Sequence, residues 1–508
     1  MSHEKQQKHL DTAHLQKGLE RRTVQGGVLT AVAQVAISLL NISATLVLAR
    51  LLLPEDFGLF GMVIVITGFL DMFKDLGLSM ATVQREDITH AQVSKLFWIN
   101  AGISTGLTAI TVALAPLVVW FYDDSRLLPI TLALASGFLL SGLGIQHKAL
   151  LKRQMRFMAL AIVDFIAVAM SVGLAIWAAW QGLSYWALLV QQLVMAVVGT
   201  IGAWVACRWR PSLPRRDTPI GELLKFGGNL TGFSLINHFS RNLDDILIGK
   251  VWGATSLGLY QKAYDILMLP LRQINQPVAS VAIPMLSRLV GQPERYRRSY
   301  LRILDKLLMI TMPLGALMIA TADWIVLLVL GENWLPAADI FRALGIGMFT
   351  QPIGNTTGWL FISQNRTGHM MRWGIVGSVL SMIAFVAGLP WGAYGVALVY
   401  SISGLLIRTP IVIWWVCKEG PVKALDIYRS ATPFALSAIT SGAALWYLRT
   451  QWEFEVIGVG LLVATLITVA VSVATLAALP SGRLALRDLK NVVTMLRKKK
   501  SAGDDPAA

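Results

Sequence analysis

Runs of roughly 20 apolar residues recur along the whole chain, and no other feature limits the possible folds as strongly. A helix of that length crosses the hydrocarbon core of a bilayer, because each residue adds about 1.5 Å. Only 14% of the 508 residues are charged, whereas soluble domains average about 25%. The chain is therefore expected to be an all-α polytopic membrane protein without a separate soluble domain.

The apolar runs divide into about fourteen expected helices. Their ranges are roughly 26–50, 57–81, 93–121, 127–147, 157–181, 184–206, 224–249, 256–286, 303–330, 338–363, 371–389, 391–416, 430–448 and 455–479. The first run is too long for the apolar part of a signal peptide, so we expect it to remain as the first span.

Basic residues follow the positive-inside pattern of an inner-membrane protein. With a cytoplasmic N-terminus, most Lys and Arg fall in alternate loops, among them Arg85, Lys152, Arg215, Arg297 and Lys418. This alternation predicts a bacterial inner-membrane protein with both termini in the cytoplasm. It also explains the net charge of +15 without nucleic acid as a partner.

A short motif recurs after 200 residues. Residues 49–60 (ARLLLPEDFGLF) align with residues 249–260 (GKVWGATSLGLY), so that a basic residue and a Gly-Leu-aromatic triplet coincide. Internal repeats are typical of transporters, and six helices between the copies make this repeat parallel. We expect an N-terminal segment (1–23), an N-lobe (24–210), a C-lobe (211–420), two additional helices (421–480) and a basic cytoplasmic tail (481–508).

Polar side chains form a stripe along the first expected helix. Thr30, Gln34, Ser38, Asn41 and Thr45 are spaced by three or four residues and therefore share one helix face. Two explanations remain open: hydrogen bonding between packed helices, or the lining of a wet cavity.

The stripe recurs in the second copy of the repeat with stronger charges. The positions 200 residues later are Ser234, His238, Arg241 and Asp245. Arg241 with Asp244 and Asp245 could form an internal salt bridge, face a cavity, or do both. Each charge is costly in lipid, so this helix requires a hydrated or paired environment.

Other charges also lie inside expected spans. Local pairs are expected for Asp71 with Lys74 and for Lys262 with Asp265, because three residues separate them. Arg272, Arg342 and Arg408 have no obvious partner nearby in the sequence and are candidates for contacting an anionic ligand. Asp164 is a candidate for pairing or ion coupling.

No catalytic constellation and no metal-ligand spacing of Cys and His is apparent, and no cofactor is expected. The outer loops are short, whereas membrane glycosyltransferases and polymerases usually need a sizeable loop for their chemistry. The sequence therefore predicts a protein that is not an enzyme.

Several segments resemble the Wzx-type polysaccharide transporters, and the chain is most similar to their colanic-acid exporter-like branch. The resemblance extends over residues 23–420. Its motifs are residues 48–60 (LARLLLPEDFGLF), 75–78 (DLGL), 83–85 (VQR), 244–250 (DDILIGK), 258–260 (GLY), 263–264 (AY), 284–288 (PMLSR), 300–302 (YLR), 334–338 (WLPAA) and 351–359.

The resemblance implies the multidrug and oligosaccharidyl-lipid exporter superfamily fold, with two six-helix lobes around a central cavity and two further helices. It also implies translocation of undecaprenyl-diphosphate-linked oligosaccharide to the periplasmic leaflet by alternating access. Expected partners are that lipid-linked oligosaccharide, membrane lipids, and the polymerase and glycosyltransferases of the same pathway.

The site prediction combines burial cost with helical spacing. Arg241, Arg272, Arg342 and Arg408 are expected to contact the diphosphate, while Gln34, Ser38, Asn41 and His238 line the cavity. Asp244, Asp245 and Asp164 are expected to couple an ion or to form pairs. Two alternatives remain: a drug or cation antiporter of the same superfamily, and a membrane polysaccharide polymerase or ligase.

Overall fold

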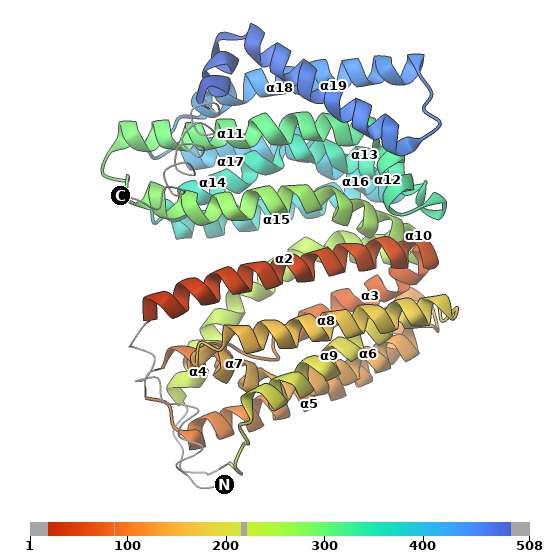
Figure 1. The fold of residues 1–508 in the computed structure, drawn as a ribbon, viewed down its shortest axis with the longest axis vertical. Coiled ribbons are helices and arrows are strands. Elements are labelled where there is room, and N and C mark those ends of the chain that lie inside the picture. Colours follow the sequence, from red (N-terminus) through yellow and green to blue (C-terminus); the bar gives the residue numbers. More distant parts are fainter. Residues whose placement is uncertain (1–18, 86, 215–220, 489–508) are drawn as a thin grey trace, which may run out of the picture. The chain divides into compact units, whose positions relative to one another are not determined.

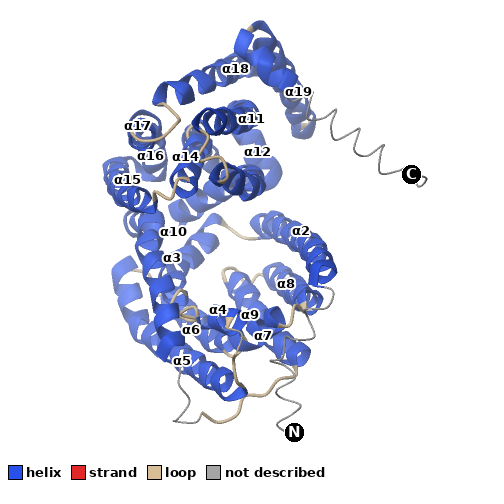
Figure 2. Ribbon diagram, turned by 90° about the vertical axis from the view of Figure 1, so that its left-hand side faces the viewer, coloured by secondary structure: helices blue, strands red, loops and turns tan. Residues whose placement is uncertain are grey.

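Helices account for every regular element that the structure describes (Figure 2). The computed structural model describes the backbone of residues 19–85, 87–214 and 221–488, and the side chains of residues 30–85, 87–214 and 242–488. The expected all-α class is therefore confirmed for these residues.

The chain forms two compact units, Met1–Gly258 and Leu259–Ala508. The first contains the helices labelled α2 to α9 in Figure 1 and the first part of α10. Their bounds are α2 Leu19–Leu51, α3 Pro54–Asp71, α4 Leu78–Gln84, α5 His90–Tyr122, α6 Leu127–Gly142, α7 Ile145–Arg153, α8 Phe157–Trp180, α9 Trp186–Cys207 and α10 Gly221–Ser287.

The second unit contains the rest of α10 and all later elements. These are α11 Pro293–Ala320, α12 Ala322–Val329, η2 Glu332–Trp334, α13 Ala337–Gly345, η3 Ile346–Phe349, α14 Gln351–Ser363, α15 Thr367–Gly388, η4 Leu389–Trp391, α16 Gly392–Ser403, η5 Gly404–Arg408, α17 Thr409–Cys417, α18 Ala424–Gln451 and α19 Ile457–Ala478.

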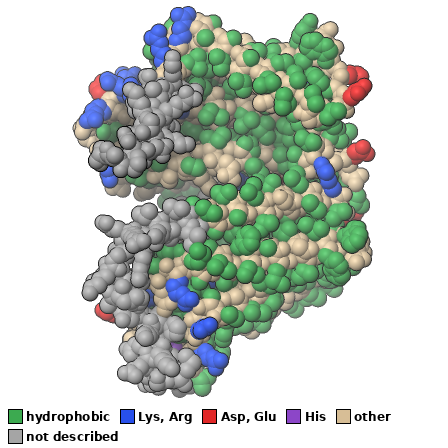
Figure 3. Space-filling view, in the orientation of Figure 1, with side chains coloured by type: hydrophobic (Ala, Val, Ile, Leu, Met, Phe, Trp, Pro, Cys, Tyr) green, Lys and Arg blue, Asp and Glu red, His purple; other side chains and the backbone are tan. Residues whose placement is uncertain are grey.

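Eight helical stretches in the described part of the chain are long and apolar enough to cross a membrane. They are Thr30–Leu51, His90–Tyr122, Leu127–Arg153, Phe157–Trp180, Trp186–Cys207, Pro293–Ala320, Thr367–Cys417 and Ile457–Ala478. The protein is thus a multi-pass membrane protein. In Figure 3, hydrophobic side chains cover most of the visible side of the helices in each unit, as lipid contact requires.

Several expected helices are interrupted or joined in ways that the sequence did not indicate; among them, 303–330 is divided into α11 and α12, and 338–363 into α13, η3 and α14. The expected helix 57–81 is divided into α3 and α4 by turns at residues 72–77, where Leu76 and Gly77 have φ of 47° and 69°. The expected helices 224–249 and 256–286 form α10, which is interrupted by the non-helical backbone of Gly253 (φ 79°, ψ −178°).

The break between α3 and α4 carries polar groups that its neighbours satisfy. The side chain of Asn100 on α5 donates to the carbonyl oxygen of Lys74 at 3.1 Å. Gln146 donates to Asn100 and accepts from Thr82, both at 2.8 Å, and all three side chains are fully buried. Non-helical backbone at membrane depth is tolerated only where such partners or water are present.

The same arginine contact occurs once in each unit, 210 residues apart. Arg156, between α7 and α8, donates from Nη1 to the carbonyl oxygen of Ala206 in α9 at 3.0 Å. Arg366, between α14 and α15, donates from Nη1 to the carbonyl oxygen of Val416 in α17 at 2.9 Å. Each arginine therefore ties the beginning of one span to the end of the next.

Helix α18 is attached to α11 by an ion pair near its first turn. Asp426, whose side chain is 7% exposed, accepts from Arg297 Nε at 2.7 Å and from the Lys423 backbone N–H at 3.0 Å. Burial alone would raise the pKa of Asp426, but these hydrogen bonds and charges hold the pKa below its usual value.

The stabilisation of the fold by the Asp426–Arg297 ion pair should therefore be lost in acid. A carboxyl with a depressed folded-state pKa stabilises the fold above its unfolded pKa of about 3.9, and the effect is lost as pH falls further. We expect Asp426→Asn to lower the thermal midpoint at pH 7, and the difference from the native chain to shrink below about pH 4. Asp488→Asn is the matched control, since that carboxylate is 44% exposed and 3.7 Å from Arg302. A pH-independent difference for Asp426→Asn would contradict this account.

Candidate functional site

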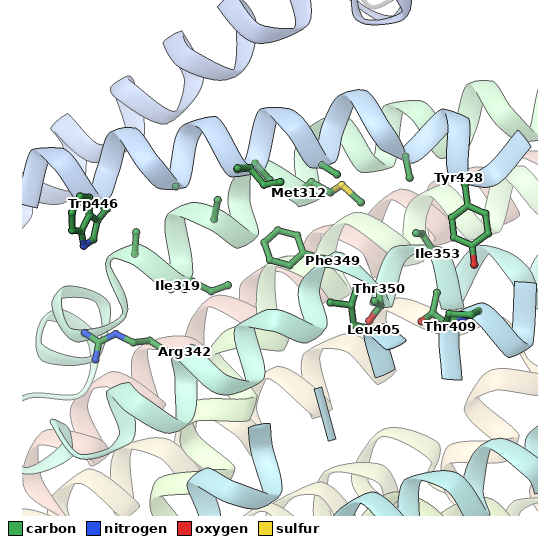
Figure 4. A pocket seen from close by; sticks show the side chains of 18 of the residues that line it. Met312, Ile319, Arg342, Phe349, Thr350, Ile353, Leu405, Thr409, Tyr428 and Trp446 are labelled. Atoms are coloured by element: carbon green, nitrogen blue, oxygen red, sulfur yellow. The ribbon is translucent and has the colours of Figure 1, made fainter. Parts of the chain in front are cut away.

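A cavity of about 900 Å³ lies within the second unit, between α18 on one side and α11, η3, α14, η5 and α17 on the other. This volume lies in the range typical of ligand sites, about 300–1,000 Å³. Figure 4 shows Arg342 and Trp446 at one end, Phe349 in the middle, and Tyr428 and Thr409 at the other end. We call this cavity the α18 groove.

Small residues on α18 leave the space that forms the α18 groove. Ala431, Ala435, Ala438 and Gly442 are spaced by three or four residues and therefore lie on one helix face, which lines the groove. The opposite wall is formed by larger apolar side chains, including Met312 of α11. The surface of the groove is therefore mostly apolar, and its polar side chains are those of Arg342, Thr350, Thr409, Tyr428, Arg449 and Thr450.

An ion-pair cluster occupies the end of the groove near Trp446. Arg449, on the last turn of α18, donates to Asp323 through Nη1 at 2.7 Å and Nη2 at 2.6 Å. Arg342 donates through Nη2 to Asp323 at 3.1 Å and through Nη1 to Asp339 at 2.6 Å. The two arginines thus share Asp323, and the guanidinium carbon of Arg449 also lies 4.8 Å from the centroid of the Trp324 ring.

The expectation that Arg342 lacks a partner nearby in the sequence was wrong. Asp339 precedes it by three residues on α13 and pairs with it, and Asp323 supplies a second carboxylate from α12. Arg342 does line the groove, but two carboxylates already offset its charge. It can contact a ligand only as part of this cluster.

Arg408 has a different environment at the end of the π-helix η5. Its guanidinium lies 3.9 Å from the centroid of the Tyr400 ring, and Nη1 donates to Ser381 Oγ at 2.9 Å. Nη2 donates to the Tyr400 carbonyl oxygen at 2.7 Å, while Nε is buried without a hydrogen-bond partner. No carboxylate pairs with Arg408 in the described part of the chain.

The π-helix η5 forms part of the wall of the α18 groove. Leu405, within η5, and Thr409, directly after Arg408, both line the groove. π-Helical turns occur frequently at functional sites. Arg408 is thus a cation with no ion-pair partner among the described residues, held directly beside the groove wall.

Five of the predicted site residues lie on α10, and the structure describes the side chains of three of them. Arg272 is exposed, two residues after Pro270. Asp244 is buried and Asp245 is half-buried. The side chains of His238 and Arg241 lie outside the described residues, so their predicted contacts remain predictions.

The polar stripe of α2 does not lie in the interface between α2 and α8. That interface contains an apolar cluster, in which Ala44 of α2 is buried against Val168 and Val172 of α8. Gln34 and Asn41 are exposed, and Ser38 is half-buried. Hydrogen bonding to α8 therefore does not explain the two exposed positions, Gln34 and Asn41.

Local pairing is confirmed where the sequence predicted it. Lys74 lies 2.5 Å from Asp71, and Lys262 lies 3.8 Å from Asp265. Asp164 on α8 pairs with Lys148 on α7 at 2.8 Å, with both side chains 38% exposed. This is the pairing alternative that the sequence left open for Asp164.

The sequence analysis missed the α18 groove and the bond between Asp323 and Arg449. The small-residue spacing on α18 was a visible signal for the groove. The bond joins residues 126 positions apart, and nothing local in the sequence indicates it.

Comparisons with known proteins agree on proteins of polysaccharide biosynthesis. A family model described as polysaccharide biosynthesis protein matches residues 47–339, more than half of the chain. The teichuronic acid biosynthesis protein TuaB of Bacillus subtilis (strain 168) is 26% identical over 391 residues, 76% of this chain and 81% of TuaB. The lipopolysaccharide biosynthesis protein WzxC of Escherichia coli (strain K12) is 25% identical over 387 residues, 75% and 78%. The succinoglycan biosynthesis transport protein ExoT of Rhizobium meliloti (strain 1021) is 23% identical over 401 residues, 76% of each.

Solved structures with the same fold are also transporters. The lipid II flippase MurJ in an inward closed conformation aligns with a TM-score of 0.68 at 15% identity, covering 91% of this chain and 99% of that chain. An inward-facing multidrug resistance MATE family transporter of the MOP superfamily aligns with a TM-score of 0.58 at 14% identity, covering 78% and 96%. At such identities the similarity identifies the fold alone.

Proposed function

The chain belongs to the polysaccharide biosynthesis protein family, and from this premise we propose that it is a lipid-linked oligosaccharide flippase. It would move undecaprenyl-diphosphate-linked repeat units across the inner membrane, for exopolysaccharide, capsule or lipopolysaccharide synthesis. The resemblance to Wzx-type transporters and the expectation of a transporter rather than an enzyme are both confirmed by the relatives.

The finer architecture is part of this proposal. It comprises fourteen spans, an N-lobe (24–210) and a C-lobe (211–420) around a central cavity, two additional helices (421–480), and cytoplasmic termini. The paired contacts of Arg156 and Arg366 support the parallel repeat. Both arginines directly follow a residue in the left-handed region, Met155 (φ 52°) or Asn365 (φ 56°). Repeats of this kind allow alternating access by movement of one bundle against the other.

The α18 groove is the observation that carries the lipid-linked part of the proposal. Its wall is apolar along most of its length, and it lies within a membrane-spanning unit. Burying a methylene group of a polyprenyl chain gains roughly 0.8 kcal/mol when the group comes from water. In a bilayer the chain is already in an apolar environment, so the groove would hold it by the fit of its shape and not by the hydrophobic effect. It would hold the chain beside the pathway while the headgroup crosses.

Arginines remain our candidates for the diphosphate. Arg408 has no paired carboxylate in the described part of the chain, and Arg272 is exposed. Guanidinium groups bind phosphate oxygens in a bidentate geometry. Arg241 is included from the sequence, together with Gln34, Ser38, Asn41 and His238 as lining, and with Asp244 and Asp245 for pairing or ion coupling.

A drug or cation antiporter is the second candidate, because the MATE transporter has a similar fold. It would need acidic residues without excess arginine in its pathway. Arg408 and Arg272 do not fit that requirement.

Vesicles containing the full chain test the proposal directly. Undecaprenyl-diphosphate-linked oligosaccharide is placed in the inner leaflet, and a membrane-impermeant glycosidase is added outside. We expect cleavage many-fold faster than in vesicles without protein. Cleavage at the protein-free rate would overturn the proposal, uptake of a fluorescent cation instead would favour the antiporter, and lengthened glycans would favour a polymerase.

A further inference from the structure

Two glycines of the repeated motif contact each other's helices reciprocally within the first unit. A Cβ built on Gly58 would lie 1.7 Å from the carbonyl oxygen of Ala254, and one built on Gly258 would lie 1.9 Å from that of Pro54. No side chain fits at either position, since real Cβ contacts do not fall below 3.0 Å. The first turn of α3 and the turn of α10 after Gly253 are thus in direct backbone contact.

The contact has the symmetry of the repeat. Pro54 and Gly58 correspond to Ala254 and Gly258 at the spacing of 200 residues, and each member of one pair meets the non-equivalent member of the other. This is the arrangement of a two-fold contact, in which residue i meets j and j meets i. Ala254 and Gly258 are small residues four positions apart, a spacing that permits such close approach of helices.

A break in the helix precedes each contacting turn at the equivalent position. Leu53, before α3, has an extended backbone with φ −85° and ψ 158°. Gly253 interrupts α10 with φ 79° and ψ −178°. Residues at the ends of helices are the ones that absorb large backbone changes in hinge motions. Both turns are therefore placed to move as short units.

We propose that Gly58 and Gly258 form the contact that closes the outer end of the transport pathway, and that each must lack a side chain for closure. This inference rests on the proposed function. The contact lies at the expected outer end of the spans, one turn beyond Lys250, whose ammonium lies 5.3 Å from the Phe121 ring centroid. Two smooth backbone surfaces can separate without the repacking that interlocked side chains would require.

Single alanine substitutions at the two glycines test the closure. Alanine is a better helix former than glycine, so helix propensity does not oppose the change. We expect Gly58→Ala and Gly258→Ala each to favour the separated arrangement and to impair transport. Gly102→Ala on α5 is the matched control, because nothing lies within 4 Å of a Cβ there.

Accessibility to an impermeant reagent reports the separation without any cargo. In a chain carrying Cys207→Ser, Cys417→Ser and Thr45→Cys, the new thiol is labelled from outside the vesicle with a charged maleimide. We expect roughly tenfold faster labelling when either glycine is replaced by alanine, and no change with Gly102→Ala. An unchanged labelling rate in folded Gly58→Ala and Gly258→Ala proteins would overturn the proposal.

A second measurement keeps the native glycines, in case the alanine variants do not fold. Spin labels are placed at Leu51→Cys and Val251→Cys, which are equivalent in the repeat and are 42% and 54% exposed. We expect two distance populations, whose ratio shifts when lipid-linked oligosaccharide is added. A single unchanging distance would identify the contact as permanent packing and overturn the proposal. Because the labelling requires no cargo, the closure can fail or hold independently of the proposed cargo.

Discussion

Replacing Asp323 with asparagine should lower the free energy of unfolding by about 2 kcal/mol. Removing one partner of a fully buried ion pair costs about 3–5 kcal/mol, and partial exposure reduces that amount. Asp323 is 21% exposed and serves two guanidinium groups, those of Arg342 and Arg449. The substitution leaves both without their shared carboxylate at the end of the α18 groove.

Thermal unfolding in detergent, followed by tryptophan fluorescence, measures this effect. Asp339→Asn is the matched control, because that carboxylate pairs with the same Arg342 at 2.6 Å but is 70% exposed. We expect it to cost less than about 0.5 kcal/mol. Equal losses for the two variants would mean that the cluster contributes by surface charge alone and not by joining α12, α13 and α18.

Filling the α18 groove should stop transport while leaving the fold intact. We expect Ala435→Phe to reduce the flipping rate at least about tenfold, because the ring would occupy space that the lipid chain is proposed to use. The groove is open enough for added atoms, as shown by Gly442 on the same face, where a Cβ would have its nearest neighbour at 4.0 Å.

Ala443→Phe provides the control on the same helix, since Ala443 is exposed and does not line the groove. Flipping is measured with the glycosidase assay, and thermal midpoints are recorded for both variants. Normal flipping by Ala435→Phe would show that the groove is not on the lipid pathway. A large loss of stability in that variant would instead show that the groove cannot accept the ring.

Hydropathy was sufficient to predict the helices but not their interruptions. The ranges expected at 157–181 and 455–479 agree with α8 and α19 within two residues. The expected helix 57–81 reads as one apolar run, yet it is divided at residues 72–77. The partners that satisfy this break, Asn100 and Gln146, come from other helices. A single sequence does not reveal which side chains will be available there.

The candidate site was less predictable than the fold for a related reason. Helical spacing identified the exposed stripe of Gln34 and Asn41, because that pattern is local. The same spacing also places Asp339 one helical turn before Arg342, but the sequence analysis overlooked this pair. The α18 groove lies between α18 and α11, and these two helices are joined by Arg297 with Asp426 and by Arg449 with the carbonyl oxygen of Ala320. Such contacts join residues more than 100 positions apart.

The π-helix at Gly404–Arg408 determines which side chains of the following helix, α17, face the core of the second unit. A π-turn holds one residue more than an α-turn, so it takes up an extra residue without changing the direction of the side chains that follow. Val412, Ile413 and Val416, which follow this turn on α17, are buried in the core of the second unit. Rewinding this turn as α-helix with all its residues would rotate these three side chains by about 100°, whereas deleting a single residue such as Leu406 would restore an unbroken α-helix and leave them in the core.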